Sequence, residues 1–305
     1  MDDDAIMKQS LSSKLVCPVC RRPLRFEGTI ADERLTNGVL QCTSRHVYQV
    51  KDEIPVLKDS KTSEKEFAWT IEFPDLKKYD RVRRKYASYL SEDLKKADKE
   101  LKDEIVKTVL DHDFVLDMAS GMGTLLLKLS RQTGKKVDLM GIDVDEKPLR
   151  AAKLKLKEQE SYNKVSLCVM DGKHLAIKQE EVPCVTSFFG FDNIPEAKVA
   201  FREVHRILVP NGRLVFATMG LEEGSKSMVE AEKLGVGAIA TDNRLTQTLE
   251  EAGFKIDKRE KRYAGEWLRN PMDLLPFEGD WFSHSLVLAH KEDKVNLAKS
   301  SINNY

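Results

Sequence analysis

The sequence predicts an α/β protein whose larger part is a parallel sheet with helices on both faces, preceded by a small metal-binding module. Three observations lead to this prediction. From residue 112 onward, short apolar runs alternate with helical patterns, as in strands joined by crossover helices. One short apolar run, which starts at Phe114 and stops at an acid, enters a small-residue turn and then a helix. Three of the five cysteines fall within residues 17–42.

Composition limits the classes of function. The chain has 305 residues, and its 50 Lys and Arg equal its 50 Asp and Glu, so it has no global field to attract nucleic acid. The balanced net charge therefore does not indicate RNA as a partner. No apolar run is long enough to span a membrane, and the acidic start, Met1–Asp4, is followed by no apolar stretch of a secretory signal. We expect a cytoplasmic protein. The sequence leaves open whether it forms a homo-oligomer.

The first module, residues 1–60, contains a candidate metal site. Cys17-Pro-Val-Cys20 is a C-x2-C knuckle, and Cys42 and His46 form a C-x3-H pair. Three thiolates and one imidazole are a set that closes a tetrahedral zinc site. Because four protein ligands leave no open position, we predict a structural zinc ion. The alternatives are a redox C-x2-C pair, for which no βαβ context follows, and separate buried thiols.

The knuckle and the segment from Tyr48 to Leu57, with its Ile54-Pro55-Val56 core, resemble the zinc ribbons that accompany some methyltransferases. The bacterial large-subunit rRNA guanine methyltransferases carry a similar ribbon, in which it helps to read RNA. The family often has glycine where this chain has Glu53. Only Arg21, Arg22 and Arg25 form a basic cluster here, and such a cluster is also typical of a solvated surface.

Residues 61–111 predict a helical bridge. A helical pattern runs from Ser91, a good N-cap, to Leu110. The preceding part is dense in aromatic residues: Phe67, Trp69, Phe73, Tyr79, Tyr86 and Tyr89. Two compatible interpretations are that they pack the bridge onto the next domain and that some form a lid over a ligand.

The predicted large domain, residues 112–291, begins with a short apolar strand from Phe114 that stops at an acid, Asp117. The turn that follows contains Ala119, Gly121 and Gly123, where the backbone must approach a ligand closely. The helix after the turn directs unpaired N–H groups and a partial positive charge back toward it. This stretch predicts a site for a nucleotide-like ligand.

Four further strands continue the pattern: 137–143, 165–170, 185–189 and 213–217. The last two predicted strands, 254–256 and 283–290, have no helical pattern between them, so we expect them to be antiparallel. Residues 292–305 are polar, and we predict a flexible tail.

The acids at the strand ends decide between two ligand classes. A dinucleotide site has G-x-G-x-x-G, whereas here the spacing is Asp117-x-Ala119-x-Gly121-x-Gly123. Asp143 ends the second strand, where an acid binds ribose hydroxyls, and Asp171 ends the third, where it suits an adenine amino group. Three acids around one crevice repel phosphates and favour a cationic cofactor.

These motifs, with Asp171-Gly172 and the block from Phe201 to Leu214, resemble the class I S-adenosylmethionine-dependent methyltransferases, in the group that includes ubiquinone and menaquinone methyltransferases. The resemblance implies a Rossmann-like seven-stranded sheet whose last strand is antiparallel. Ala119-Ser120 departs from the family's usual Gly-Cys or Gly-Ser. The implied cofactor-binding residues are Asp117, Ala119, Gly121, Gly123, Asp143, Val144, Asp171, Gly172 and Phe188.

Methyl transfer needs in-line positioning more than a protein nucleophile. Asp192, after the fourth strand, is the candidate base if the acceptor carries a proton; capping of the next helix is its alternative role. Three functions remain: a methyltransferase for a small molecule, which balanced charge and aromatic residues slightly favour; one for RNA or a translation protein; and a non-catalytic cofactor-binding scaffold.

Overall fold

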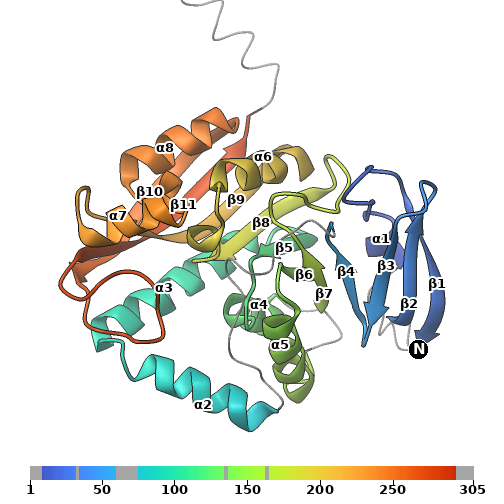
Figure 1. The fold of residues 1–305 in the computed structure, drawn as a ribbon, viewed down its shortest axis with the longest axis horizontal. Helices are drawn as coiled ribbons and strands as arrows, with labels where there is room; N and C mark the ends of the chain where they lie inside the picture. The colour runs from blue at the N-terminus through green and yellow to red at the C-terminus, as the bar shows by residue number, and fades with distance from the viewer. Residues whose placement is uncertain (1–8, 32–33, 60–74, 134–136, 162–164, 293–305) are drawn as a thin grey trace, which may run out of the picture.

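The computed structural model describes residues 9–31, 34–59, 75–133, 137–161 and 165–292. Within them, one sheet of eleven strands runs through the molecule, with helices on both faces (Figure 1). Its strand order is β1-β2-β3-β4-β7-β6-β5-β8-β9-β11-β10. The predicted tail and the chain start at Met1–Asp4 lie outside the described residues, as do Phe67, Trp69 and Phe73 of the bridge.

The seven strands from β7 to β10 confirm the predicted α/β sheet. Strands β7, β6, β5, β8 and β9 are parallel, and β11 is antiparallel to both of its neighbours. The strands are β5 (Phe114–Met118), β6 (Asp138–Asp143), β7 (Val165–Met170), β8 (Val182–Phe188), β9 (Leu208–Leu221), β10 (Phe254–Glu266) and β11 (Trp281–Lys291).

Amphipathic helices cover the two faces of this sheet (Figure 1). One face packs against α3 (Glu92–Val109), α4 (Thr124–Gln132) and α5 (Glu146–Glu158). The other packs against α6 (Ala197–Ile207) and α8 (Asp242–Glu251). The remaining helices are α1 (Gln9–Ser12), α2 (Leu76–Ala87), α7 (Lys226–Lys233) and the short 3-10 turns η3 (Phe191–Asn193) and η4 (Gly237–Ile239). None of the described helices combines the length and apolarity needed to cross a membrane.

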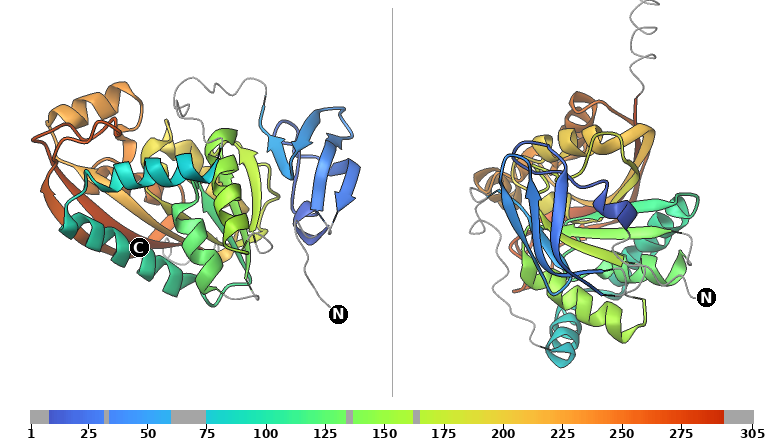
Figure 2. Two further views of the ribbon diagram at one scale, coloured as in Figure 1. Left: turned by 90° about the horizontal axis from the view of Figure 1, so that it is seen from below. Right: turned by 90° about the vertical axis from the view of Figure 1, so that its right-hand side faces the viewer.

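The first module consists of an antiparallel meander, β1 (Leu24–Ala31), β2 (Arg34–Cys42), β3 (Val47–Lys51) and β4 (Ile54–Leu57). Its last strand pairs in parallel with β7, with Val56 opposite Val169 and Leu57 opposite Met170. The module therefore extends the main sheet, an arrangement that the sequence did not predict. Figure 2 shows it at one end of the molecule, with the β10–β11 hairpin at the other.

Polar contacts fix the module to the rest of the chain. Val16 N donates to Ala176 O at 3.0 Å, and Lys178 N donates to Lys14 O at 2.9 Å. The Arg21 guanidinium pairs with Glu203 of α6 at 2.9 Å. Leu15, in the same segment, is fully buried. The module is thus docked on its own chain, beside the connection that follows β7.

Two differences from the predicted elements concern length. Strand β9 starts at Leu208, directly after α6, whereas the sequence predicts a break at Pro210–Gly212 and a strand only from 213. Asn211, with a φ of +58°, lies in a bulge that shifts the register of β9 against β8 between the pairs Val182–Leu208 and Cys184–Arg213. From Cys184 onward the two strands pair regularly. Strand β10 runs to Glu266 because β11 pairs with it along its whole length.

Candidate functional site

The turn between β5 and α4 is built from residues in the left-handed backbone region. Ala119, Gly121 and Gly123 have φ values of +49°, +52° and +74°. A Cβ on Gly123 would lie 2.9 Å from the Cβ of Ala152, so glycine also lets α5 approach. Gly123 N donates to Ser120 O at 2.8 Å, which closes the turn. The tight turn that the sequence places at the end of β5 is therefore held by its own backbone N–H groups: Ser120 N donates to Ile142 O at 2.9 Å and Gly121 N to Asp143.

Two acids follow neighbouring strands at this edge. Asp117 lies opposite Gly141, and Asp143 lies opposite Val169. Asp143 accepts hydrogen bonds from Gly121 N at 2.9 Å and from Asp145 N at 3.0 Å, so it holds the turn in place. The two carboxylates therefore meet at the turn where the sequence placed them.

Neither acid forms an ion pair with any residue that the structure describes. Asp117 is 1% exposed, and its Oδ1 accepts from Thr186 Oγ1 at 3.1 Å. Burial raises the pKa of Asp117 to about 7 and the pKa of Asp143 to about 6. A ligand cation at this position would favour the charged forms, whereas a phosphate would oppose them.

The third predicted acid, Asp171, is buried in the turn after β7, where its Oδ1 accepts from Lys173 N at 2.8 Å. Gly172 lies against the end of β5, since an added Cβ would come within 3.0 Å of Met118 Cε. Val144, directly after Asp143, is half-buried. The predicted residues after β5, β6 and β7 thus share one edge of the sheet.

The bridge reaches the same turn. Tyr79 of α2 donates its hydroxyl to Met122 O at 3.1 Å, and its side chain is 1% exposed. Arg83, one helical turn later, donates to Thr124 Oγ1 at 3.2 Å. Part of the aromatic bridge therefore packs on the β5–α4 turn, consistent with both interpretations of that segment.

Comparison with known proteins now identifies the chain. The model of the ubiE/COQ5 methyltransferase family matches residues 76–233. This chain belongs to the ubiE/COQ5 methyltransferase family. The matched segment begins at α2 and contains the β5–α4 turn and all three acids.

Individual relatives agree with this assignment. A demethylmenaquinone methyltransferase from Lactobacillus johnsonii is 32% identical over 123 residues, which are 40% of this chain and 48% of that protein. The ubiquinone/menaquinone biosynthesis C-methyltransferase UbiE of Yersinia enterocolitica is 34% identical over 101 residues, 33% of this chain and 40% of that protein. The chain thus matches less than half the length of each of these relatives.

Solved structures show the same fold. The YcgJ protein from Bacillus subtilis matches with a TM-score of 0.50 at 12% identity, covering 64% of this chain and 99% of that one. The MccD protein matches with a TM-score of 0.50 at 18% identity, covering 63% and 96%. At such identities the likeness concerns the fold alone.

The family implies S-adenosylmethionine as cofactor, and the site is chemically suited to it. Its two buried carboxylates, Asp117 and Asp143, accept hydrogen bonds from uncharged groups and form no ion pair among the described residues, and the cofactor carries an ammonium and a sulfonium. The turn beside them contains Gly121 and Gly123, which carry no side chain toward a ligand. The residues present therefore fit the group.

The four predicted metal ligands come together in the first module. The ligand atoms of Cys17, Cys20, Cys42 and His46 all lie within 4.8 Å of one another. Cys20 and Cys42 Sγ are 3.7 Å apart, and His46 Nδ1 lies 3.3 Å from Cys17 Sγ and 3.4 Å from Cys42 Sγ. Tetrahedral zinc with bonds of about 2.0–2.3 Å separates its ligand atoms by roughly 3.5–3.8 Å. This Cys3His cluster therefore suggests a zinc site.

The candidate base Asp192 has both carboxylate oxygens engaged. They accept from Thr218 Oγ1 at 2.6 Å and from Met219 N at 3.0 Å, which ties the turn after β8 to β9. Burial raises the pKa of Asp192 to about 7. The residue does not cap α6, whose N-cap is Glu196. A catalytic role for Asp192 stays a prediction, and these contacts favour a structural one.

Sequence reasoning missed a polar cluster beside Phe188, on the face that α3 covers. His284 Nδ1 lies 2.9 Å from Asp98 Oδ1, and the two residues are 186 positions apart. Lys102 Nζ lies 4.5 Å from the centre of the Phe188 ring. The sequence signals are weak: a histidine between two serines at the start of an apolar run, and an acid and a lysine one helical turn apart.

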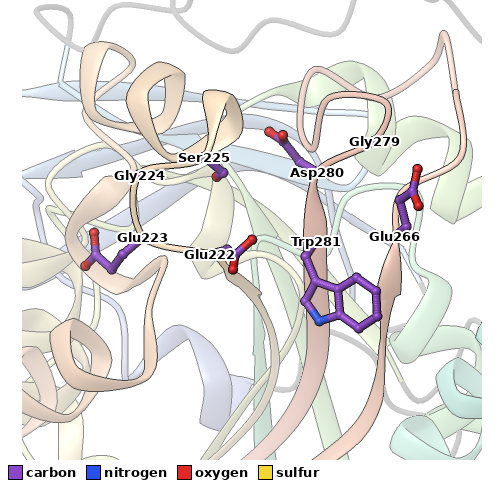
Figure 3. A pocket seen from close by; sticks show the side chains of 8 residues that line it. All are labelled: Glu222, Glu223, Gly224, Ser225, Glu266, Gly279, Asp280 and Trp281. Atoms are coloured by element: carbon purple, nitrogen blue, oxygen red, sulfur yellow. The ribbon is translucent and has the colours of Figure 1, made fainter.

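A surface hollow lies at the ends of β9, β10 and β11 (Figure 3). Four acids, Glu222, Glu223, Glu266 and Asp280, surround it with Trp281. Asp280 accepts from Ser227 N and Ser227 Oγ, each at 2.6 Å, and so fixes the start of α7. No predicted site residue lines this hollow.

Proposed function

We propose that this protein transfers the methyl group of S-adenosylmethionine to a small-molecule acceptor. The observation that carries the proposal is the placement of Asp117 and Asp143, two buried acids that form no ion pair with any described residue, at the ends of adjacent strands around a glycine turn, in a chain of the ubiE/COQ5 methyltransferase family. When bound, the cofactor supplies a methyl group on a positively charged sulfur.

The chain's own residues would bind and orient the cofactor. We assign Asp143 to the ribose hydroxyls, Asp171 to the adenine amino group and Asp117 to the cationic methionine part. The turn 119–123, together with Val144, Gly172 and Phe188, would line the site. Calorimetry with S-adenosylmethionine tests this: Asp143→Ala should weaken binding by tenfold or more, and unchanged affinity would contradict the ribose assignment.

A small acceptor is favoured over RNA because Arg21 of the first module already has partners within the chain. Arg21 is engaged by Glu203 and by the carbonyl of Leu175, so the basic cluster is partly occupied within the chain. The relatives' names, which refer to menaquinone and ubiquinone, also support a small acceptor. RNA or a translation protein, as for ribbon-bearing rRNA methyltransferases, is the second candidate, and a non-catalytic scaffold is the third.

A tritiated-methyl assay on total RNA, protein and small-molecule extracts separates these functions. Label in the small-molecule fraction supports the proposal. Label in RNA or protein supports the second candidate, and cofactor binding without any labelled fraction supports the scaffold.

We also propose that Cys17, Cys20, Cys42 and His46 hold a structural Zn²⁺. Tyr48, whose hydroxyl lies 3.1 Å from Cys17 Sγ, would donate a hydrogen bond to this thiolate and orient it. Metal analysis of protein purified without chelator should give about one equivalent of zinc. Less than half an equivalent would count against the assignment.

A further inference from the structure

The pairing of His284 with Asp98 fixes the protonation of the imidazole. Asp98 belongs to α3 and His284 to β11, and their side chains are only 14% and 10% exposed. Because a carboxylate only accepts, the contact assigns the ring proton to Nδ1. Among the described residues no hydrogen-bond partner of Nε2 is found, so that nitrogen presents a free lone pair.

The imidazole lies next to the turn that contacts the cofactor site. Phe189 packs its ring on that of His284, with centroids 4.2 Å apart. Phe189 takes a φ of +57°, a strained conformation for a bulky residue. The next residue, Gly190, lies against Ala119, since an added Cβ would come within 2.7 Å of the Ala119 Cβ. One short turn therefore joins His284 to the β5–α4 turn.

A lysine without an ion pair completes the cluster. Lys102 lies one turn after Asp98 on α3, and its ammonium rests on the Phe188 ring. Among the described residues Lys102 forms no ion pair: Asp103 is paired with Lys128, and the negative charge of Asp98 favours the charged lysine from beyond ion-pair distance. Burial lowers the pKa of Lys102, so the charged form would gain from a bound anion.

We propose that His284, oriented by Asp98, accepts the proton of a hydroxyl on the methyl acceptor, and that Lys102 binds the resulting oxyanion. This inference rests on the proposed function and adds to it the residues that would activate a hydroxyl of the acceptor. Asp98 is a positioning residue, since it acts through the imidazole.

The step balances without a further reactant. The acceptor O–H bond breaks, and its proton moves to His284 Nε2. The electron-rich acceptor, at oxygen or at an adjacent carbon, forms a bond to the methyl carbon while the carbon–sulfur bond breaks and its electron pair stays on sulfur. If carbon attacks, that carbon then loses its own proton to water. The products are the methylated acceptor and S-adenosylhomocysteine.

The first test detects proton transfer without methyl transfer. Full-length protein saturated with S-adenosylhomocysteine is mixed with p-nitrophenol, whose anion absorbs visible light, at a pH where the free probe is mainly protonated. Wild-type protein should increase the anion fraction. His284→Gln and Lys102→Met should each weaken anion binding by roughly tenfold or more. An equal anion fraction with wild type and His284→Gln overturns the proposal.

The same strand provides a matched control. His290 Nδ1 lies 2.8 Å from Asp257 Oδ1, a second His–Asp pair at the other end of β11. His290→Gln should leave the anion fraction unchanged. Thermal melting of each variant ensures that only folded protein is compared, and Asp98→Asn offers a second route if His284→Gln does not fold.

Methyl transfer to the labelled acceptor provides the second test. His284→Gln should lower kcat by about 10²–10⁴-fold, the usual contribution of a general base, with the affinity for S-adenosylhomocysteine unchanged. Asp98→Asn should lower kcat more than it changes KM, and Asp98→Glu should restore part of the rate. Full activity of His284→Gln overturns the base assignment alone. A wild-type protein that binds no cofactor overturns the proposed function together with it.

Discussion

Asp117 allows the electrostatic account of the site to be tested in the absence of ligand. Its carboxylate is 1% exposed, and burial raises its pKa from 3.8 to about 7. Each pKa unit corresponds to about 1.4 kcal/mol, so at pH 8 the ionised group costs the ligand-free fold about 4 kcal/mol. Asp117→Asn removes the charge and keeps an oxygen that can accept from Thr186. The variant should therefore be more stable than wild type when no cofactor is bound.

The sign of the pH dependence follows from proton binding. Because the folded-state pKa of Asp117 lies above the unfolded value, the folded protein binds more protons between about pH 4 and pH 7. The contribution of this group to the free energy of unfolding of the wild-type protein therefore falls as the pH rises through that window. We expect Asp117→Asn to raise the free energy of unfolding by about 2–4 kcal/mol at pH 8 and by less than about 2 kcal/mol at pH 5.

Urea unfolding followed by circular dichroism, without cofactor, measures both values. Asp111→Asn is the control, because Asp111 is exposed and precedes the same strand. Calorimetry should show the opposite trend for ligand binding: Asp117→Asn should bind S-adenosylmethionine at least about tenfold more weakly, since a charge-assisted contact is lost. Equal stability changes at pH 5 and pH 8 would refute the assignment of a buried, uncompensated charge.

Two further perturbations address the metal and the turn. Removal of zinc with a chelator should lower the thermal midpoint and also weaken cofactor binding, because the first module holds residues 175–177 beside the turn after β7. Thermal melting and calorimetry, before and after zinc is restored, measure the two effects. Gly123→Ala should destabilise the fold by about 1–3 kcal/mol through its positive φ, and more than Gly224→Ala, because Gly224 shares a positive φ but has open space where Gly123 meets Ala152. Urea midpoints that rank the two variants in the reverse order would contradict the packing argument.

The position of the proposed cofactor-binding acids along the sheet edge could be predicted because their signals are local. Asp117 to Gly123 lie in one continuous stretch, and the other acids each directly follow an apolar strand. The carboxyl ends of parallel strands meet at one edge, so strand order alone brings these residues together. The same logic predicted the antiparallel end of the sheet, since β10 and β11 have no helix between them.

The pairing on which the proposed acceptor site rests could not be predicted because it depends on contacts between distant elements. His284 and Asp98 are 186 residues apart, and neither lies in a recognisable motif. The pairing of β4 with β7 has only two matched residue pairs, too few for a pattern in the sequence. Such contacts are set by how the bridge and the first module pack on the finished sheet.

Sheet order also separates the metal from the proposed chemistry. Strands β7, β6, β5, β8 and β9 lie between β4 and β11. At about 4.8 Å between neighbouring strands, these six steps place β4 about 25–30 Å from the strand that carries His284. A metal held by Cys17 and Cys42 therefore cannot reach an acceptor at His284. It can act on the proposed cofactor site, because Arg21, directly after the knuckle, contacts Leu175 in the connection that follows Asp171 and Glu203 of α6, which itself accepts from Leu175 N. Loss of zinc should thus weaken cofactor affinity and leave the rate at saturating cofactor nearly unchanged, whereas His284→Gln should do the reverse.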